Sequence, residues 1–316
     1  MTSIRPFLLA IAPLIIGLTT YYVYWRSEAE GLQKSVAKVT GAADVQVDGF
    51  PYRLEAGLPS LNITRGGNGA SVTLTAGRSQ IGSGPFRAGL YVGQLTDVEI
   101  AAQAAGFGGI VITSDNARAS LRAGELVERL SMRFERASIS MSLFDGNFDA
   151  VPLEIHFRET PNAEPAETAT PPAQAELRLA GTFRAAQRAF SAALPLKITA
   201  DAPLASLSAW RNGGTVEIDG GTLSGSDGAA LAGFDATIAP LPGGTLALSG
   251  TIATDCPATL AAFIHGDAGP DKEFRQRRPA RFALGGSIDQ PSLRRLQTPS
   301  GGRVRNLEPP CPDLRR

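Results

Sequence analysis

Few residues in this chain have the types and the spacing that catalysis requires. The 316 residues include only two histidines, His156 and His265. His156 lies on the polar side of the alternating segment Leu153–Phe157, where a surface position is expected. A serine hydrolase would carry its nucleophile in a G-x-S-x-G elbow, and the sequence has no such motif; Ser83, between two glycines, is better explained as part of a turn. We therefore expect a protein that is not an enzyme and has no catalytic residue.

One acidic segment resembles the start of a calcium-binding loop. Asp145, Asn147 and Asp149 occupy the first three ligand positions of such a loop. Ala150 stands where the loop needs glycine, and His156 stands where the bidentate glutamate belongs, so a hairpin turn is the better interpretation. Two cysteines and two distant histidines do not have the ligand spacing of a zinc site. The sequence therefore predicts no bound metal and no other cofactor.

The two cysteines, Cys256 and Cys311, are each followed by a proline. In an exported domain an isolated pair is usually bridged, so we expect a disulfide; two unrelated free thiols are the alternative. The bridge would remove unfolded-state entropy worth about 4 kcal/mol in the chain-entropy model. It would also tie the basic C-terminal tail, residues 291–316, to the domain. That tail either meets anionic lipid head groups or is a solvated, weakly ordered terminus.

A turn with two aromatic residues, Gly49-Phe50-Pro51-Tyr52, is the other feature singled out by residue type. Pro51 fixes its own φ and pushes Phe50 towards an extended conformation, so Phe50 and Tyr52 should flank a rigid corner. We interpret them as aromatics that cap the core at a turn rather than as ligand contacts. Trp210, shortly before two glycines, is interpreted in the same way.

The elements that would position these residues begin with an apolar segment, Phe7–Trp25, of nineteen residues without a charge. At about 1.5 Å per residue it just spans a hydrocarbon core of about 30 Å. Three tyrosines and a tryptophan lie at its end, as in an aromatic belt at a membrane surface. A cleaved signal peptide is the alternative, but its apolar region would be shorter, about 7–15 residues. We expect residues 1–6 in the cytoplasm, residues 7–25 as an uncleaved transmembrane anchor, and the rest exported.

Beyond the anchor the hydrophobic period changes. Residues 26–41 have apolar side chains at helical spacing and predict a juxtamembrane helix. From Asp44 onwards short segments alternate with a period of two and are separated by glycine-containing turns. Helical windows that parallel crossovers would need are missing, so the strands should pair antiparallel.

The predicted fold class is therefore mainly β: an N-terminal transmembrane helix followed by an antiparallel, curved β-sheet domain in two lobes with few short helices. Residues 42–158 and 175–290 are the expected lobes. The segment between them, residues 159–174, has four prolines and no bulky apolar residue. Such a composition predicts an extended linker or a long exposed loop.

Several turn signatures resemble a known family: Asp48–Arg53, Trp210–Gly214 leading into Val216–Asp219, Gly233–Pro240, and Pro242–Leu246. Together with the N-terminal apolar segment they are similar to an uncharacterised alphaproteobacterial envelope family, domain of unknown function 2125. More distantly the pattern is similar to the AsmA-type envelope proteins. That resemblance implies an inner-membrane anchor, a periplasmic β domain and a role near lipid or outer-membrane homeostasis, and it offers no catalytic residues.

A long curved sheet in an anchored protein suggests a binding role. An exposed apolar face larger than a few hundred Å² usually marks a binding site, and beside a membrane its natural ligand is a lipid or lipoprotein acyl chain. We expect a single-pass bacterial inner-membrane protein with its bulk in the periplasm, which binds or passes lipid along an apolar groove. The alternative is an envelope scaffold that recruits another envelope protein through edge strands or the linker; an unrecognised enzyme is a third possibility. Thirty basic and thirty acidic residues argue against a nucleic-acid partner.

Overall fold

The computed structural model describes most of the chain, and every structural statement below refers to that part. It comprises residues 5–42, 45–67, 69–84, 86, 89–105, 108–124, 127–142, 146–161, 171–185, 188–201, 210–241, 245–265, 267, 269–270, 272–296 and 309–315.

Most of the described residues are in β-strands. The helices with described bounds are α1 (Arg5–Thr40) and α3 (Pro257–His265). The strands are β1 (Gln46–Asp48), β2 (Leu54–Leu58), β3 (Leu61–Gly67), β4 (Ala70–Ala76), β5 (Ser79–Ser83), β6 (Leu90–Ala104), β7 (Gly108–Ala123), β8 (Val127–Phe134), β9 (Ala137–Met141), β10 (Gly146–Glu159), β11 (Ala173–Ala185), β12 (Arg188–Thr199), β13 (Thr215–Gly225), β14 (Ala230–Pro240), β15 (Leu246–Thr254), β16 (Ala280–Gly286) and β17 (Pro291–Arg295).

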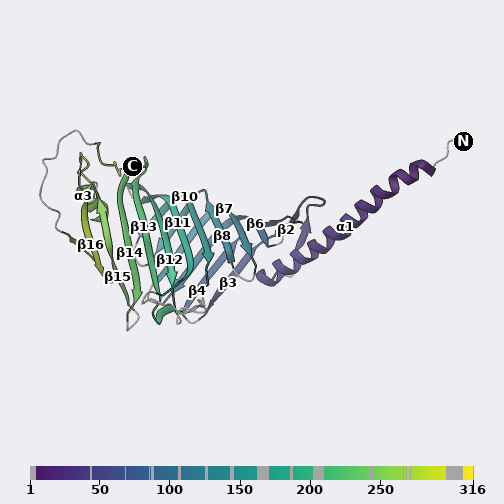
Figure 1. Cartoon of the computed structure of the whole chain (residues 1–316), viewed down its shortest axis with the longest axis horizontal. Coiled ribbons are helices and arrows are strands. Elements are labelled where there is room, and N and C mark those ends of the chain that lie inside the picture. Colours follow the sequence, from purple (N-terminus) through teal and green to yellow (C-terminus); the bar gives the residue numbers. More distant parts are fainter. Residues whose placement is uncertain are drawn as a thin grey trace.

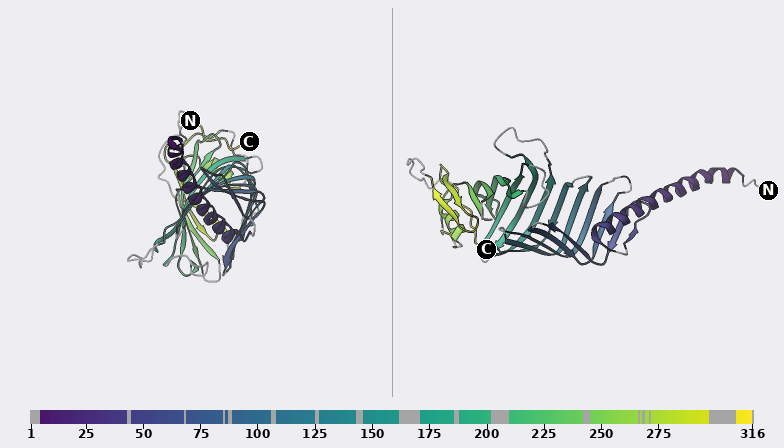
Figure 2. Two further views of the ribbon diagram at one scale, coloured as in Figure 1. Left: turned by 90° about the vertical axis from the view of Figure 1, so that its right-hand side faces the viewer. Right: turned by 90° about the horizontal axis from the view of Figure 1, so that it is seen from below.

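These seventeen strands form one antiparallel sheet, with α1 projecting from one end (Figure 1). From β10 to β17 each strand pairs with the next one in the chain. The strands therefore stand side by side along the long axis of the molecule (Figure 2). A mainly β, antiparallel fold is as predicted, because the period-two pattern dominates the chain after residue 44.

Long strands in this sheet are bent in the middle. Leu95 and Val98 of β6 are three residues apart, yet both belong to the same buried cluster. In a regular strand an odd spacing places side chains on opposite faces, so β6 must change direction between them. Asp97, with a φ of 50°, lies at that point in a left-handed conformation that aspartate tolerates better than most residues.

The same bend recurs in later strands and forms a crease. In β10, Ala150 and Leu153 are again three residues apart in one cluster, and the register shifts between them. Register shifts follow at Ala193/Leu196 in β12 and at Ile218/Gly221 in β13. Irregularities of this kind bend strands and curve sheets.

The crease divides the sheet into two walls that face each other. The first part of β6 pairs with β5 and its second part with β4; β7 and β10 likewise pair with β8 along one part and with β9 along the other. We call this folded sheet the trough, its enclosed side the inner face, and its other side the outer face.

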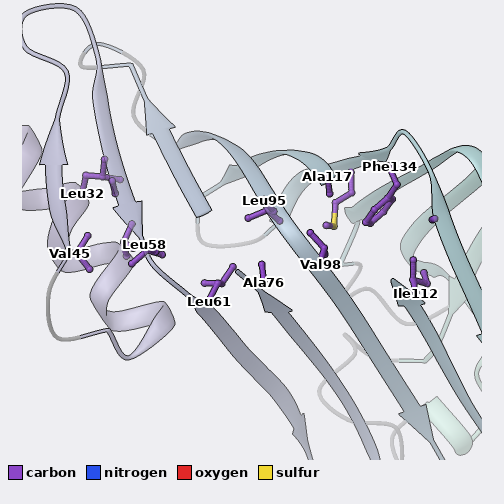
Figure 3. Packing of buried hydrophobic residues seen from close by; sticks show 14 of the residues in the cluster. Leu32, Val45, Leu58, Leu61, Ala76, Leu95, Val98, Ile112, Ala117 and Phe134 are labelled. Carbon is purple, nitrogen blue, oxygen red and sulfur yellow. The ribbon is translucent and has the colours of Figure 1, made fainter. Parts of the chain in front are cut away.

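The first half of the trough has a closed apolar core. It contains residues from both walls and from α1, including Phe134, Leu58 and Leu32, which are 0, 2 and 5 % exposed (Figure 3). α1 contributes Trp25, Ala29, Leu32 and Val36, which recur at helical spacing on one side of the helix. The second half of α1 therefore covers the inner face at the β1–β3 end of the sheet.

A second, smaller core lies under α3 near the other end. Its buried members include Phe190, Leu231, Leu260 and Leu314. Phe148 and Phe183 pack against both cores, so apolar packing is continuous between them.

The N-terminal helix α1 includes the predicted anchor, residues 7–25, and nearly all of the predicted juxtamembrane helix, residues 26–41. α1 runs without interruption through Pro13 and through the boundary between the two segments. Among the helices that the structure describes, none combines the length and the apolar character needed to cross a lipid bilayer.

The two predicted lobes, residues 42–158 and 175–290, are parts of one continuous sheet. β10 and β11 flank the proline-rich segment and pair in register as far as Glu159 and Ala175. Residues 162–170 of that segment lie outside the described residues.

Candidate binding surface

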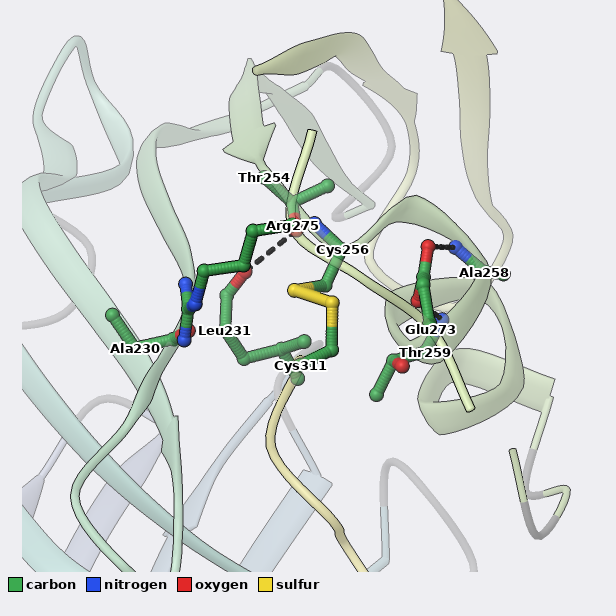
Figure 4. Close-up of a disulfide and its surroundings, with 9 residues drawn as sticks. All are labelled: Ala230, Leu231, Thr254, Cys256, Ala258, Thr259, Glu273, Arg275 and Cys311. Carbon is green, nitrogen blue, oxygen red and sulfur yellow. Dashed lines mark hydrogen bonds between the residues drawn. A yellow bond between two sulfur atoms is a disulfide. The ribbon is translucent and has the colours of Figure 1, made fainter. Parts of the chain in front are cut away.

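The predicted disulfide between Cys256 and Cys311 is present, with an S–S distance of 2.07 Å (Figure 4). Cys256 is fully buried, and its backbone N–H donates to Thr254 Oγ1 at 2.9 Å. The bridge holds the segment 309–315 against the second core, where Leu314 is 6 % exposed. In the part of the chain that the structure describes, no cysteine is free.

Two acidic residues fix the surroundings of this disulfide. Glu273 accepts hydrogen bonds from the first turn of α3, from the N–H groups of Ala258 at 2.9 Å and Thr259 at 2.7 Å (Figure 4). This carboxylate satisfies donors that a helix start leaves unpaired. Hydrogen bonds from Arg315 lower the pKa of the Asp313 carboxyl, so Asp313 stays charged at neutral pH.

The aromatic turn 49–52 lies against α1, where Phe50 contacts Trp25 of the first core. Gly49 has a φ of 104°, and the Phe50 ring packs edge-on against Tyr22 and Trp25, with centroids 5.4 and 5.5 Å away. Trp25 Nε1 also donates to the carbonyl oxygen of Arg53 at 2.9 Å. Tyr52 is 82 % exposed, so it does not cap the core as we expected from the sequence.

Trp210 is 4 % exposed and occupies the connection between β12 and β13. Its indole N–H donates to the carbonyl oxygen of Thr215 at 3.3 Å, and a side chain at Gly214 would collide with its ring. The next residue, Arg211, donates to the carbonyl oxygen of Ala105, which follows β6. Trp210 therefore anchors a turn that joins two distant parts of the sheet.

The polar residues considered for chemistry do not converge. The His156 ring lies 3.0 Å from Ser131 Oγ and 3.8 Å from Glu154 on the outer face, whereas His265 ends α3 and contacts the carbonyl oxygen of Ala261. Among the described residues, no group of three or more His, Cys, Asp or Glu side chains could hold a metal ion. Asp145 lies outside the described residues.

Charged side chains of the outer face pair with one another instead. Arg133 lies 3.0 Å from Glu154, Arg158 lies 2.9 Å from Glu176, and Lys197 lies 3.4 Å from Asp219. A hollow of about 440 Å³ near His156 is lined by Arg158, Glu176, Lys197 and Asp219 together with neighbouring residues. Exposed pairs of this kind mainly keep the outer face hydrated.

The inner face carries a continuous row of uncharged, mostly apolar residues, which we call the apolar row. It crosses eleven strands, from β6 to β17 without β9, through residues paired in register: Tyr91, Leu121, Leu130, Phe157, Leu177, Leu196, Ile218, Ala236, Gly250, Leu284 and Leu293. At about 4.8 Å per strand the row is about 48 Å long. Beside it in β11–β15 runs a shorter row: Ala175, Ile198, Val216, Ile238 and Leu248.

Part of the apolar row is left without a core. Its five bulky members between β10 and β16 are partly buried, and they belong to neither of the two cores that the described residues form: Phe157, Leu177, Leu196, Ile218 and Leu284. A sheet face normally buries such side chains against another layer. We call these five residues the open stretch of the row, and they are the candidate binding surface.

Sequence reasoning could not locate this surface. The alternation of Leu177 with Arg178, or of Leu196 with Lys197, shows which residues share a face of one strand. Which strand lies beside which, and whether another layer covers them, depends on residues far apart in the chain.

Comparison with known proteins gives one match. The model of the family DUF2125, described as an uncharacterized protein conserved in bacteria, matches residues 26–255. No curated protein and no solved structure matches the chain.

Proposed function

The chain belongs to the DUF2125 family of uncharacterized bacterial proteins, and we propose that it is a non-enzymatic envelope protein that binds lipid acyl chains along the trough. The observation that carries this proposal is the open stretch of the apolar row. Each methylene group that such a surface takes out of water contributes about 0.8 kcal/mol, so an acyl chain is a ligand whose chemistry fits it.

The length of the apolar row favours a route along which lipid moves, rather than a pocket that holds a single acyl chain. Two acyl chains laid end to end fill a hydrocarbon core of about 30 Å, so one chain extends about 15 Å. A row of about 48 Å is long enough for several chains in succession. We therefore propose that lipid moves along the trough rather than resting in one closed site.

We further propose that α1 attaches the protein to the bacterial inner membrane and that the sheet lies in the periplasm. Residues 7–25 carry no charge. Leu14, Ile15, Ile16 and Leu18 of α1 are 56–65 % exposed, and apolar side chains in that state favour a lipid or protein environment. The Cys256–Cys311 disulfide supports an oxidising compartment.

Lipid analysis of the purified full chain tests the binding proposal. The protein is extracted in detergent, washed, and exchanged into a lipid-free polymer, and its lipids are quantified by mass spectrometry. We expect phospholipid at stoichiometric or higher amounts. Repeated absence of lipid, together with failure to take up a fluorescent phospholipid from vesicles, would refute the proposal.

Photo-crosslinking locates the bound chain. A photoreactive amino acid at Leu196 faces the trough, and the same amino acid at Lys197 faces the outer side of the same strand. We expect lipid adducts at Leu196 and none above background at Lys197. Equal labelling at both positions would show that lipid binds without using the trough.

A scaffold function is the second candidate, and one observation favours it. All five residues of β17 are exposed, and β17 pairs only with β16 among the described strands. An edge of this kind can accept a strand from another protein. Crosslinks from Ser292 to an envelope protein, without lipid adducts at Leu196, would favour this function over lipid binding.

A further inference from the structure

Aromatic rings from three separate segments meet where α1 joins the sheet. Tyr22 and Tyr24 come from α1, Phe50 from the β1–β2 turn, and Phe86 from the β5–β6 connection. The Phe86 ring stacks on Tyr24 with centroids 5.7 Å apart and an interplanar angle of 11°, and Phe50 lies 5.4 Å from Tyr22. Tyr21 links the two pairs, at 6.0 Å from Phe50 and 6.2 Å from Phe86. We call these residues, with the adjacent Tyr52, the aromatic collar.

The collar is unusually exposed for a group of aromatic side chains. Phe86 is 74 % exposed, Tyr52 82 %, Phe50 44 %, Tyr22 44 % and Tyr24 38 %. Aromatic side chains normally bury most of their surface, so a contiguous exposed group marks a contact with something outside the chain. This apolar surface continues along α1 through Val23, which is 63 % exposed.

The position of the collar along α1 identifies the partner. Towards the N-terminus lie residues 7–20, which are uncharged; towards the C-terminus begin Arg26, Glu28 and Glu30. The collar stands where the helix changes from uncharged to charged. Tyrosine and tryptophan gather at that level in membrane proteins, because their rings prefer the head-group region. A bilayer surface therefore fits the collar better than a protein partner would.

We propose that the sheet itself touches the membrane surface through Phe50, Tyr52 and Phe86, beside the point where α1 leaves the bilayer. This inference rests on the proposed membrane attachment of α1. Phe50 and Phe86 lie at the level of the α1 tyrosines because their rings contact them. The partner is the head-group region of the same membrane.

The contact places one end of the trough at the membrane. Tyr52 is followed two residues later by Leu54, which is 2 % exposed in the first core. Phe86 precedes β6, whose Tyr91 is the first residue of the apolar row. Along the chain, the collar is therefore only a few residues from the first core at Leu54 and from the beginning of the row at Tyr91.

Site-specific fluorescence on the full chain tests this inference. The two native cysteines are bridged, so a cysteine introduced at Tyr52 or Phe86 is the one thiol available to a polarity-sensitive probe. The labelled protein is reconstituted into vesicles of phosphatidylethanolamine and phosphatidylglycerol that carry quenchers on the lipid both near the head group and along the acyl chain. Matched labels at Leu18 on α1 and at Ser249, an exposed residue of β15, serve as references.

We expect emission at positions 52 and 86 to shift to shorter wavelength and to be quenched several-fold more than at position 249. Quenching at position 18 without quenching at 52 and 86 would overturn the collar contact and leave membrane attachment standing. Absence of quenching at position 18 would overturn the attachment itself. A blue shift at 52 and 86 without lipid quenching, in a protein that migrates as a dimer, would assign the collar to a second copy and also overturn the inference.

Discussion

Leu177 and Arg178 are neighbours in β11 whose side chains leave opposite faces of the sheet. Leu177 pairs in register with Leu196 inside the trough, whereas Arg178 is exposed on the outer face. The contrast repeats in β12 with Leu196 and Lys197. Substitutions at two adjacent positions therefore alter the same strand but opposite faces of the sheet. Comparing them separates an effect on the inner face from a general effect on the strand.

Leu177→Gln and Arg178→Gln form a matched pair that introduces the same side chain on opposite faces. We expect Leu177→Gln to lower the amount of copurified phospholipid several-fold, because a polar group then interrupts the apolar row. Arg178→Gln should retain the lipid. Mass spectrometry of lipid per mole of protein measures both; equal losses in the two variants would contradict a role of the inner face.

Substitution of Phe134 tests the packing of the first core. Its side chain is 0 % exposed between the two walls. We expect Phe134→Ala to reduce the free energy of unfolding by about 3–5 kcal/mol, because it leaves a cavity. Val92→Ala, on the outer face at 52 % exposure, is the control and should change it by less than about 0.5 kcal/mol. Urea titration of the detergent-solubilised protein measures both, and similar midpoints would contradict the two-walled core.

The helices α1 and α3 cover different ends of the inner face. α1 uses one side of its second half to cover the inner face at the β1–β3 end, through Trp25, Leu32 and Val36. α3 covers the inner face near the other end and depends on partners distant in sequence: Glu273 at its start and the disulfide beneath it. The five partly buried residues of the open stretch belong to neither of the two cores that these helices cover.

Removal of the disulfide should weaken the element that it supports. Cys256 and Cys311 are 55 residues apart, and a bridge of that span contributes about 4 kcal/mol in the chain-entropy model. We expect the double variant Cys256→Ala/Cys311→Ala to unfold at a clearly lower temperature than the native chain. A reducing agent should lower the melting temperature of the native protein towards that of the variant and leave the variant unchanged. Equal melting temperatures of the native protein and the variant without reducing agent would show that the bridge is not stabilising.

At the scale of the whole molecule, the chain is an elongated trough with α1 projecting from one end (Figure 2). Successive strands lie about 4.8 Å apart, so each additional hairpin lengthens the inner face without changing its cross-section. This architecture gives an inner face that extends beyond the two apolar cores. It suits a ligand that is itself long and apolar.

The orientation of the molecule is tested by a reporter fused after residue 316. We expect alkaline phosphatase, which is active only after export, to be active there, because the sheet is proposed to lie in the periplasm. The fusion should stay in the membrane fraction after alkaline extraction, and deletion of residues 1–25 should release it. An inactive reporter combined with an active cytoplasmic one at the same position would refute the proposed localisation.

The sequence by itself determined the class of fold, the cysteine pair and the residues that share a face within each strand. These properties depend on local pattern: a period of two places Leu177 and Leu179 together, and an apolar spacing along one side makes the second half of α1 a helix that packs. Residue type also distinguished Phe50 and Tyr52, but the sequence does not show how exposed their side chains are. Phe86 is a single phenylalanine in a connection that contains glycine and proline, so no sequence pattern distinguishes it.

Only the tertiary structure decided which strands are neighbours, where the sheet is creased and which apolar residues remain outside a core. The apolar row joins residues from Tyr91 to Leu293, and its existence depends on register across eleven strands rather than on any one of them. The crease depends on odd spacings such as Leu95 and Val98, which a strict alternation would place on opposite faces. The apolar row and the crease both result from long-range strand pairing, because the neighbour of a strand is set by residues far away in the chain.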